Sequence, residues 1–176
     1  MATSSSSPRI TIVALQPRLR ADTETPQQAI DHVIDLMGRA AAHTEASPDV
    51  QRLFVLPELC PVGYTDHTFA HHLPTTAEKQ QLYRDLDTQM AETAQRLNVH
   101  ICYGTVGWHS KRDTTNSQDD KSSSSSSSKH DFTIRQIVVE PTAGLQIAVY
   151  DKMHICDVGD CAEGRFFVPS PSRQPV

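Results

Sequence analysis

The sequence predicts one α/β domain in which helices pack against a sheet. The chain has 176 residues, which is enough to bury a single core. Short apolar, β-branched runs alternate with longer segments whose apolar residues recur every three to four positions. The resulting order is β-α-β-α-β-β-β, without an internal repeat. Chains that alternate elements in this way fold as layers of helix on sheet.

The first two elements are a strand and a helix. Residues 10–15 form a β-branched, apolar run that predicts an inner strand, and Gln16-Pro17 closes it because proline cannot donate to a ladder. Thr25 then fits a helix N-cap, with Pro26 in the first helical position. The apolar face of this helix consists of Ile30, Val33, Ile34 and Met37.

A second strand, a second helix and a third strand follow. Residues 53–56 are continuously apolar, as in strands that are buried on both sides. Thr75 to Glu78 fits a capping box that opens a helix. The core stripe of that helix consists of Leu82, Leu86, Met90, Ala94 and Leu97. Residues 99–108 are predicted to form the third strand.

The remainder of the chain contains a hairpin and three polar segments. The serine-rich stretch 110–129 predicts a disordered insertion at a loop tip, because it cannot bury enough apolar surface to offset its ordering entropy. Strands are predicted at 132–139 and 145–150, joined by a turn that contains proline and glycine. Residues 1–9 are predicted to be a disordered tail, and 170–176 an irregular one. The domain therefore spans 10–169.

Composition argues against several classes of partner. The net charge is −5, and the scattered lysines and arginines form no cluster of the kind that binds nucleic acid. No apolar run reaches the length needed to cross a membrane. Four cysteines without an apolar leader segment indicate reduced thiols, and hence a cytoplasmic location.

Two charged residues directly follow predicted strands. Glu58 follows an apolar strand and a proline, where partial desolvation raises the pKa of a carboxyl group toward that of a general base. Lys152 follows another strand, where an ammonium group can stabilise a developing oxyanion or lower the pKa of a nearby thiol. Taken alone, each residue has a simpler interpretation, as an exposed side chain at a strand end.

The order of these motifs resembles that of the carbon-nitrogen hydrolase (nitrilase/amidase) superfamily. The matching segments are 12–17, Leu56-Pro57-Glu58-Leu59 with Gly63-Tyr64, 101–105, 150–155 and 160–169. Each motif is short, but the shared order makes them specific together. They cover the front portion of a family domain. The resemblance implies a four-layer αββα sandwich, formed when two such domains pair through helices, here in a C-terminally truncated form.

The resemblance also implies a chemistry. A cysteine thiolate attacks an amide, carbamoyl amide or nitrile carbon, with Glu58 as the base and Lys152 as the oxyanion stabiliser. No metal or organic cofactor is needed. Tyr64 either lines the substrate pocket or is a buried aromatic residue. Asp160 and Glu163 both occupy the stretch where the family often has a second acidic residue that orients the lysine or the substrate, and the alternative is that they belong to a solvated loop.

The cysteine of this triad is expected at the end of a later strand. Cys102 precedes the lysine and is predicted to be a small core residue. Cys60 lies too close to Glu58 in sequence, while Cys156 and Cys161 come too soon after the lysine. His154, Cys156 and Cys161 do not make a predicted zinc site, because zinc takes four ligands and a fourth is not evident. The chain is therefore expected to carry only two triad members and to be inactive alone.

Two other functions are compatible with the sequence. One is a non-catalytic remnant that pairs with a full-length relative through the family's pairing surface, or with itself as a homo-oligomer. The truncated sheet is also expected to have an unpaired edge and an uncovered apolar face, which favour aggregation. The other is an unrelated α/β binding module, which requires Glu58 and Lys152 to lie far apart.

Overall fold

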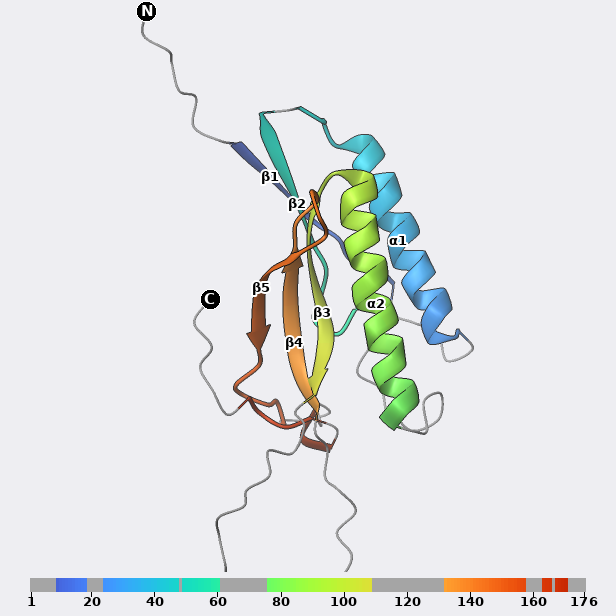
Figure 1. The fold of residues 1–176 in the computed structure, drawn as a ribbon, viewed down its shortest axis with the longest axis vertical. Coiled ribbons are helices and arrows are strands. Elements are labelled where there is room, and N and C mark those ends of the chain that lie inside the picture. Colours follow the sequence, from blue (N-terminus) through green and yellow to red (C-terminus); the bar gives the residue numbers. More distant parts are fainter. Residues whose placement is uncertain are drawn as a thin grey trace, which may run out of the picture.

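The computed structural model describes residues 9–18, 24–47, 49–60, 76–108, 132–157, 163–165 and 167–170. Within these residues the chain forms five strands and two α-helices in the predicted order (Figure 1). The elements are β1 (Arg9–Ala14), α1 (Pro26–His43), β2 (Val50–Val55), α2 (Thr76–Leu97), β3 (His100–Trp108), β4 (Phe132–Val139) and β5 (Gln146–Asp151), followed by the single-turn helix η2 (Glu163–Arg165).

The five strands form one sheet in the order β1-β2-β3-β4-β5. Strands β1, β2 and β3 are parallel, β4 is antiparallel to β3, and β5 is antiparallel to β4. The carboxyl ends of β2, β3 and β5 therefore lie at the same edge of the sheet. The chain leaves β2 toward Glu58 and leaves β5 toward Lys152 at this edge, which is why residues so far apart in sequence can meet.

Both helices cover the same face of the sheet (Figure 1). Thr25 caps α1 as predicted, and it forms a capping box with Gln28. The buried residues of α1 and α2 confirm the two predicted stripes. Ile30, Met37, Leu86, Met90 and Ala94 are each 0% exposed. Tyr83 adds a buried aromatic side chain that the stripe did not include.

The opposite face of the sheet is covered by no described helix or strand. Phe54 and Ile101 are in register and fully buried under the helices, so the residues that alternate with them point the other way. We call this the open face. Three of its apolar residues, Val106, Phe132 and Ile134, are buried near the carboxyl end of β3. The others are partly or largely exposed: Ile10, Ile12, Leu53, Val55, Cys102, Val138, Ala148 and Tyr150.

Two strand predictions are corrected here. β1 was predicted to be an inner strand, but it lies at the edge of the sheet, and Ile10 and Ile12 are 61% and 66% exposed. The prediction failed because β-branched composition does not reveal how many neighbouring strands a strand has. β2 is fully buried on its helix-facing side only.

Most element bounds agree with the predictions to within one residue. β2 begins three residues early, at Val50, because the polar residues Gln51 and Arg52 pair with β1. Arg9 belongs to β1 rather than to a tail. The serine-rich stretch 110–129, residues 1–8 and 171–176, and the predicted cap at Thr75 lie outside the described residues. Among described residues, no helix is long and apolar enough to cross a membrane.

Candidate active site

Glu58 is held by a tight turn at the carboxyl end of β2. The Leu56 amide donates to the Cys102 carbonyl at 2.8 Å, and the Cys60 amide donates to the Pro57 carbonyl at 3.3 Å. Between them Leu59 is buried and adopts a positive φ of 50°. This backbone region is uncommon for a residue with a side chain, so the surrounding contacts must hold the turn in place.

Gly104 of β3 lies directly beneath this turn. A Cβ atom at position 104 would stand 2.3 Å from the Leu59 nitrogen and 2.9 Å from the Glu58 carbonyl carbon. Both contacts are with backbone, which has little freedom to move aside. The glycine therefore sets how closely the Glu58 turn approaches the sheet.

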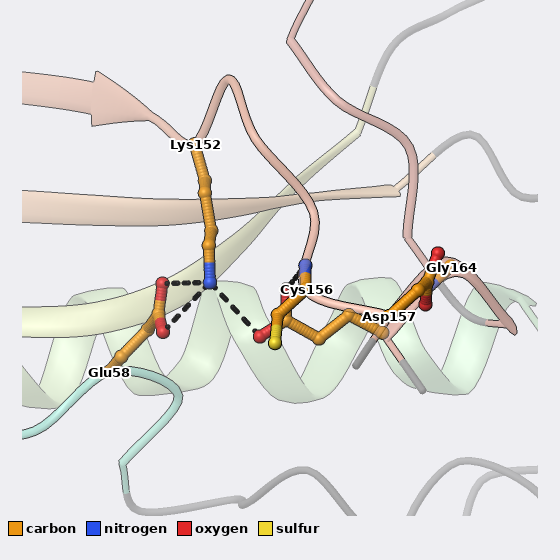
Figure 2. A network of polar contacts seen from close by, with 6 residues as sticks. Glu58, Lys152, Cys156, Asp157 and Gly164 are labelled. Atoms are coloured by element: carbon orange, nitrogen blue, oxygen red, sulfur yellow. Dashed lines mark hydrogen bonds and ion pairs between the residues drawn. The ribbon is translucent and has the colours of Figure 1, made fainter. Parts of the chain in front are cut away.

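Lys152 is fixed by its backbone on two sides. Its amide donates to the Ile134 carbonyl of β4 at 2.8 Å, and its carbonyl accepts from the Ser170 amide at 2.9 Å. The end of β5 is thus held between a neighbouring strand and the segment that follows η2. The side chain leaves this anchored point toward the carboxylates (Figure 2).

Glu163 approaches from η2. Its amide donates to the Cys156 carbonyl at 3.1 Å, and its Oε2 accepts from the Cys156 amide at 2.8 Å. The Glu163 side chain is 5% exposed. A buried carboxylate requires compensating partners, and Lys152 supplies the charge.

The Lys152 ammonium contacts two glutamates, Glu58 and Glu163, and Figure 2 shows the contact with Glu58. Nζ is 3.2 Å from both carboxylate oxygens of Glu58 and 3.0 Å from Oε1 of Glu163. The Lys152 and Glu58 side chains are 22% and 35% exposed. We call these three residues the lysine cluster.

Two opposing effects set the pKa of Lys152. Partial burial acts to lower the pKa, but hydrogen bonds to Glu163 and Glu58 and their negative charges outweigh it, so the pKa is raised above its ordinary value. The ammonium is therefore a fixed cation at neutral pH. Glu58, the more exposed carboxylate, is the group that a ligand can reach.

The structure brings together three of the five residues that the sequence nominated. Glu58 and Lys152 are in contact, which contradicts the arrangement that an unrelated binding module required. Glu163 joins them through the lysine. Tyr64 and Asp160 lie outside the described residues.

The described cysteines occupy three different settings, and all three are free. Cys60 is buried, and burial raises the pKa of its thiol to about 12. Cys102 is not the core residue that was predicted. It lies on the open face, where its sulfur accepts a hydrogen bond from Gln136 Nε2 at 3.3 Å. Cys156 is half-buried beside Glu163. The described residues contain no group of three or more side chains suited to hold a metal ion.

Sequence reasoning missed the residues that support this site. Gly104 was noted only as part of a strand, although a glycine inside an apolar strand is itself a signal of close backbone approach. Arg135 and Asp151 form an ion pair next to Lys152 that was not anticipated. Their pairing depends on the strand register, which the sequence did not specify.

No protein-family model and no curated protein matches this chain. Solved structures do match. An amidase from Nesterenkonia sp. has a TM-score of 0.62 at 18% identity, over 93% of this chain and 49% of that one. A carbon-nitrogen hydrolase from Helicobacter pylori has a TM-score of 0.58 at 18% identity, over 92% of this chain and 44% of that one.

A third match is a variant of a Nesterenkonia amidase in complex with acrylamide. Its TM-score is 0.64 at 16% identity, and the alignment covers 99% of this chain and 53% of that one. The chain therefore has the fold of about half of a carbon-nitrogen hydrolase. It spans about half the length of the proteins that it matches.

Proposed function

We propose that this chain carries the glutamate and the lysine of a hydrolase that acts on non-peptide carbon–nitrogen bonds. The substrates are small-molecule amides, carbamoyl amides or nitriles. The observation that carries the proposal is the Lys152 ammonium, within 3.2 Å of two carboxylates at the carboxyl edge of the sheet. The shared fold supports it, because the structural neighbours are amidases.

In the proposed reaction Glu58 moves protons and Lys152 stabilises charge. A thiol gives its proton to Glu58 as its sulfur bonds to the amide carbon, and the carbonyl oxygen takes up the electron pair. Lys152 donates a hydrogen bond to that oxygen. Glu58 then returns the proton to the departing amine as the carbon–nitrogen bond breaks. Water hydrolyses the remaining thioester, with Glu58 accepting the proton of the water.

Two of the described thiols, those of Cys60 and Cys102, are poorly suited to be the nucleophile. A thiol with a pKa of about 12, as at Cys60, is almost entirely protonated at neutral pH. Cys102 already accepts a hydrogen bond on the open face. A Nesterenkonia amidase variant is described as adding acrylamide at an active-site cysteine. We therefore propose that a cysteine outside the described residues supplies the sulfur here.

The test begins with the transcript beyond the codon for Val176, read in all three frames. The 176-residue chain alone should release no ammonia from small amides or nitriles. A protein extended through a strand that ends in cysteine should release it, and Glu58→Gln and Lys152→Met should each abolish release. Lys79→Met, which alters a lysine on α2, is the matched control and should remain active.

Two results would contradict the proposal. One is robust ammonia release by the 176-residue chain that survives Cys102→Ala. The other is an extended protein that keeps its activity after Glu58→Gln.

The open face favours a second candidate, a non-catalytic chain that pairs with a full-length relative or with a second copy. Ile12 is 66% exposed there, with Tyr150 on the opposite edge strand 46% exposed. Sedimentation of the chain with a full-length relative should show a stable mixed oligomer that Ile12→Ser weakens. A chain that stays monomeric or aggregates in the mixture counts against pairing.

A further inference from the structure

A second charged pair lies immediately behind the lysine cluster. Asp151 precedes Lys152 in the chain and its side chain is 3% exposed. It is the register partner of Arg135 on β4. Arg135 Nε lies 2.6 Å from Asp151 Oδ1, and Nη2 lies 3.0 Å from Oδ2. Two parallel hydrogen bonds of this kind fix the direction of a carboxylate as well as its distance.

Neighbouring elements hold the guanidinium in place. A Cβ atom at Gly107 of β3 would stand 2.8 Å from both Cζ and Nε of Arg135, so the guanidinium lies against bare backbone. Thr133 adds a longer contact, 3.5 Å from its hydroxyl to Asp151 Oδ1. From α2, the negative charge of Asp87 also acts on Arg135. Asp87 itself accepts a hydrogen bond from the Tyr103 hydroxyl at 3.0 Å.

Two consecutive residues of β4 thereby hold the last residue of β5 and the residue that follows it. The Ile134 carbonyl accepts from the Lys152 amide, and the Arg135 side chain binds Asp151. Successive side chains of a strand point to opposite faces. Asp151 is anchored on the helix-covered side, while Lys152 leaves the strand end toward Glu58 and Glu163 (Figure 2).

We propose that the Arg135–Asp151 pair is a positioning element that aims Lys152 at its two carboxylates. The pair fixes the last residue of β5, and this fixes the point from which the lysine side chain starts. A buried ion pair adds little net stability over apolar side chains of similar size, so geometry is the better account of its presence. The inference rests on the catalytic role proposed above for Lys152.

The test uses substitutions that keep every charge. Arg135→Lys retains the cation but loses the two parallel hydrogen bonds. Gly107→Ala pushes on the guanidinium and on the Thr133 hydroxyl beside it, without changing any ionisable group. The readout is the pKa of the Lys152 ammonium, which is measured by NMR of the lysine side chains in the full 176-residue chain. Both variants should lower the pKa of Lys152 by about 0.5, roughly a threefold change in proton affinity, because the ammonium would lie farther from the Glu58 and Glu163 carboxylates.

Arg52→Lys is the matched control. It weakens the hydrogen bonds of a buried arginine at the opposite end of the sheet. It should therefore reduce the free energy of unfolding without changing the pKa of Lys152. The proposal is overturned if Arg135→Lys and Gly107→Ala both leave that pKa unchanged, or if Arg52→Lys lowers it equally.

The measurement requires no nucleophile, so it separates two failures. A pKa that falls as expected, in an extended protein that never releases ammonia, would support the positioning role and contradict the hydrolase.

Discussion

The two ends of the sheet stabilise charged side chains in different ways, although β2 runs from one end to the other. Near its start, β2 carries Arg52, which is 7% exposed. Beyond its end lies Glu58, in the lysine cluster. Arg52 donates to the Leu97 carbonyl at 2.7 Å and to the Ala41 carbonyl at 3.3 Å, so one guanidinium bonds to the last turns of both helices. The lysine cluster relies instead on opposite charges of side chains.

This difference indicates which end is suited to chemistry. The carbonyls at a helix C-terminus carry partial negative charge, and a cation that binds them completes the helices. Such a contact is buried, and the guanidinium already has its hydrogen-bond acceptors. At the other end Lys152 and Glu58 are partly exposed, and each can exchange a partner for a ligand. A cation that supports the fold, such as Arg52, can thus be distinguished from one suited to catalysis, such as Lys152, by the groups that bind it.

The largest effect is expected from Gly104→Ala, at the end of the sheet that holds the lysine cluster. The new methyl group would press on the Leu59 and Glu58 backbone, and overpacking of this kind costs about 3 kcal/mol. Urea denaturation should show the loss in the free energy of unfolding. Gly38→Ala on α1 is the control, because nothing lies within 4 Å of its added Cβ. It should be neutral or stabilise by up to about 1 kcal/mol. Equal behaviour of the two variants would contradict the close approach at Gly104.

Arg52→Met should have the next largest effect, at the opposite end of the sheet. Helix carbonyls that lose a buried partner cost about 2 kcal/mol. The same denaturation measurement reports the loss, and the pKa of Lys152 should stay unchanged because the lysine cluster is remote. A shift of that pKa would show that the two ends are coupled, and the comparison would then fail.

The smallest effect is expected at Glu140, in the turn between β4 and β5. Its carboxylate accepts from the amides of Ala143 and Thr142, both at 2.7 Å. These backbone hydrogen bonds, with Ala143 first, lower its pKa to about 2. A lowered pKa in the folded state gives stability that is present above the ordinary pKa and is lost as pH falls through the folded value.

Glu140→Gln should therefore be slightly less stable than the unaltered chain at neutral pH. The difference should vanish as pH falls from about 4.3 toward 2, which thermal melts across that range would record. A difference that persists at pH 2 would show that the carboxylate charge is not what the turn uses.

The sequence predicts what is local and misses what depends on register. Thr25 and Pro26 set the start of α1, because a cap acts within one turn. Glu58 and Lys152 could be nominated because each follows an apolar strand in a familiar order. The nomination of Glu163 beside Asp160 could not be resolved, because both residues follow the same motif and only the fold brings Glu163 to the lysine.

The supporting residues were missed for a related reason. The pairing of Arg135 with Asp151 requires counting across a hairpin that contains an irregularity at Val138 and Val139. The edge position of β1 was missed because apolar composition describes a strand's faces and not its neighbours. Exposed Ile10 and Ile12 therefore appeared to belong to an inner strand.

The most direct test of the account is the pKa of Lys152 in the unaltered chain, measured by NMR of its side chain. The account predicts a value above the ordinary lysine pKa of about 10.4, and a fall in that value in Glu163→Gln. A pKa at or below the ordinary value, or one that does not respond to Glu163→Gln, would mean that the ammonium is not held between the two glutamates, and would contradict the account.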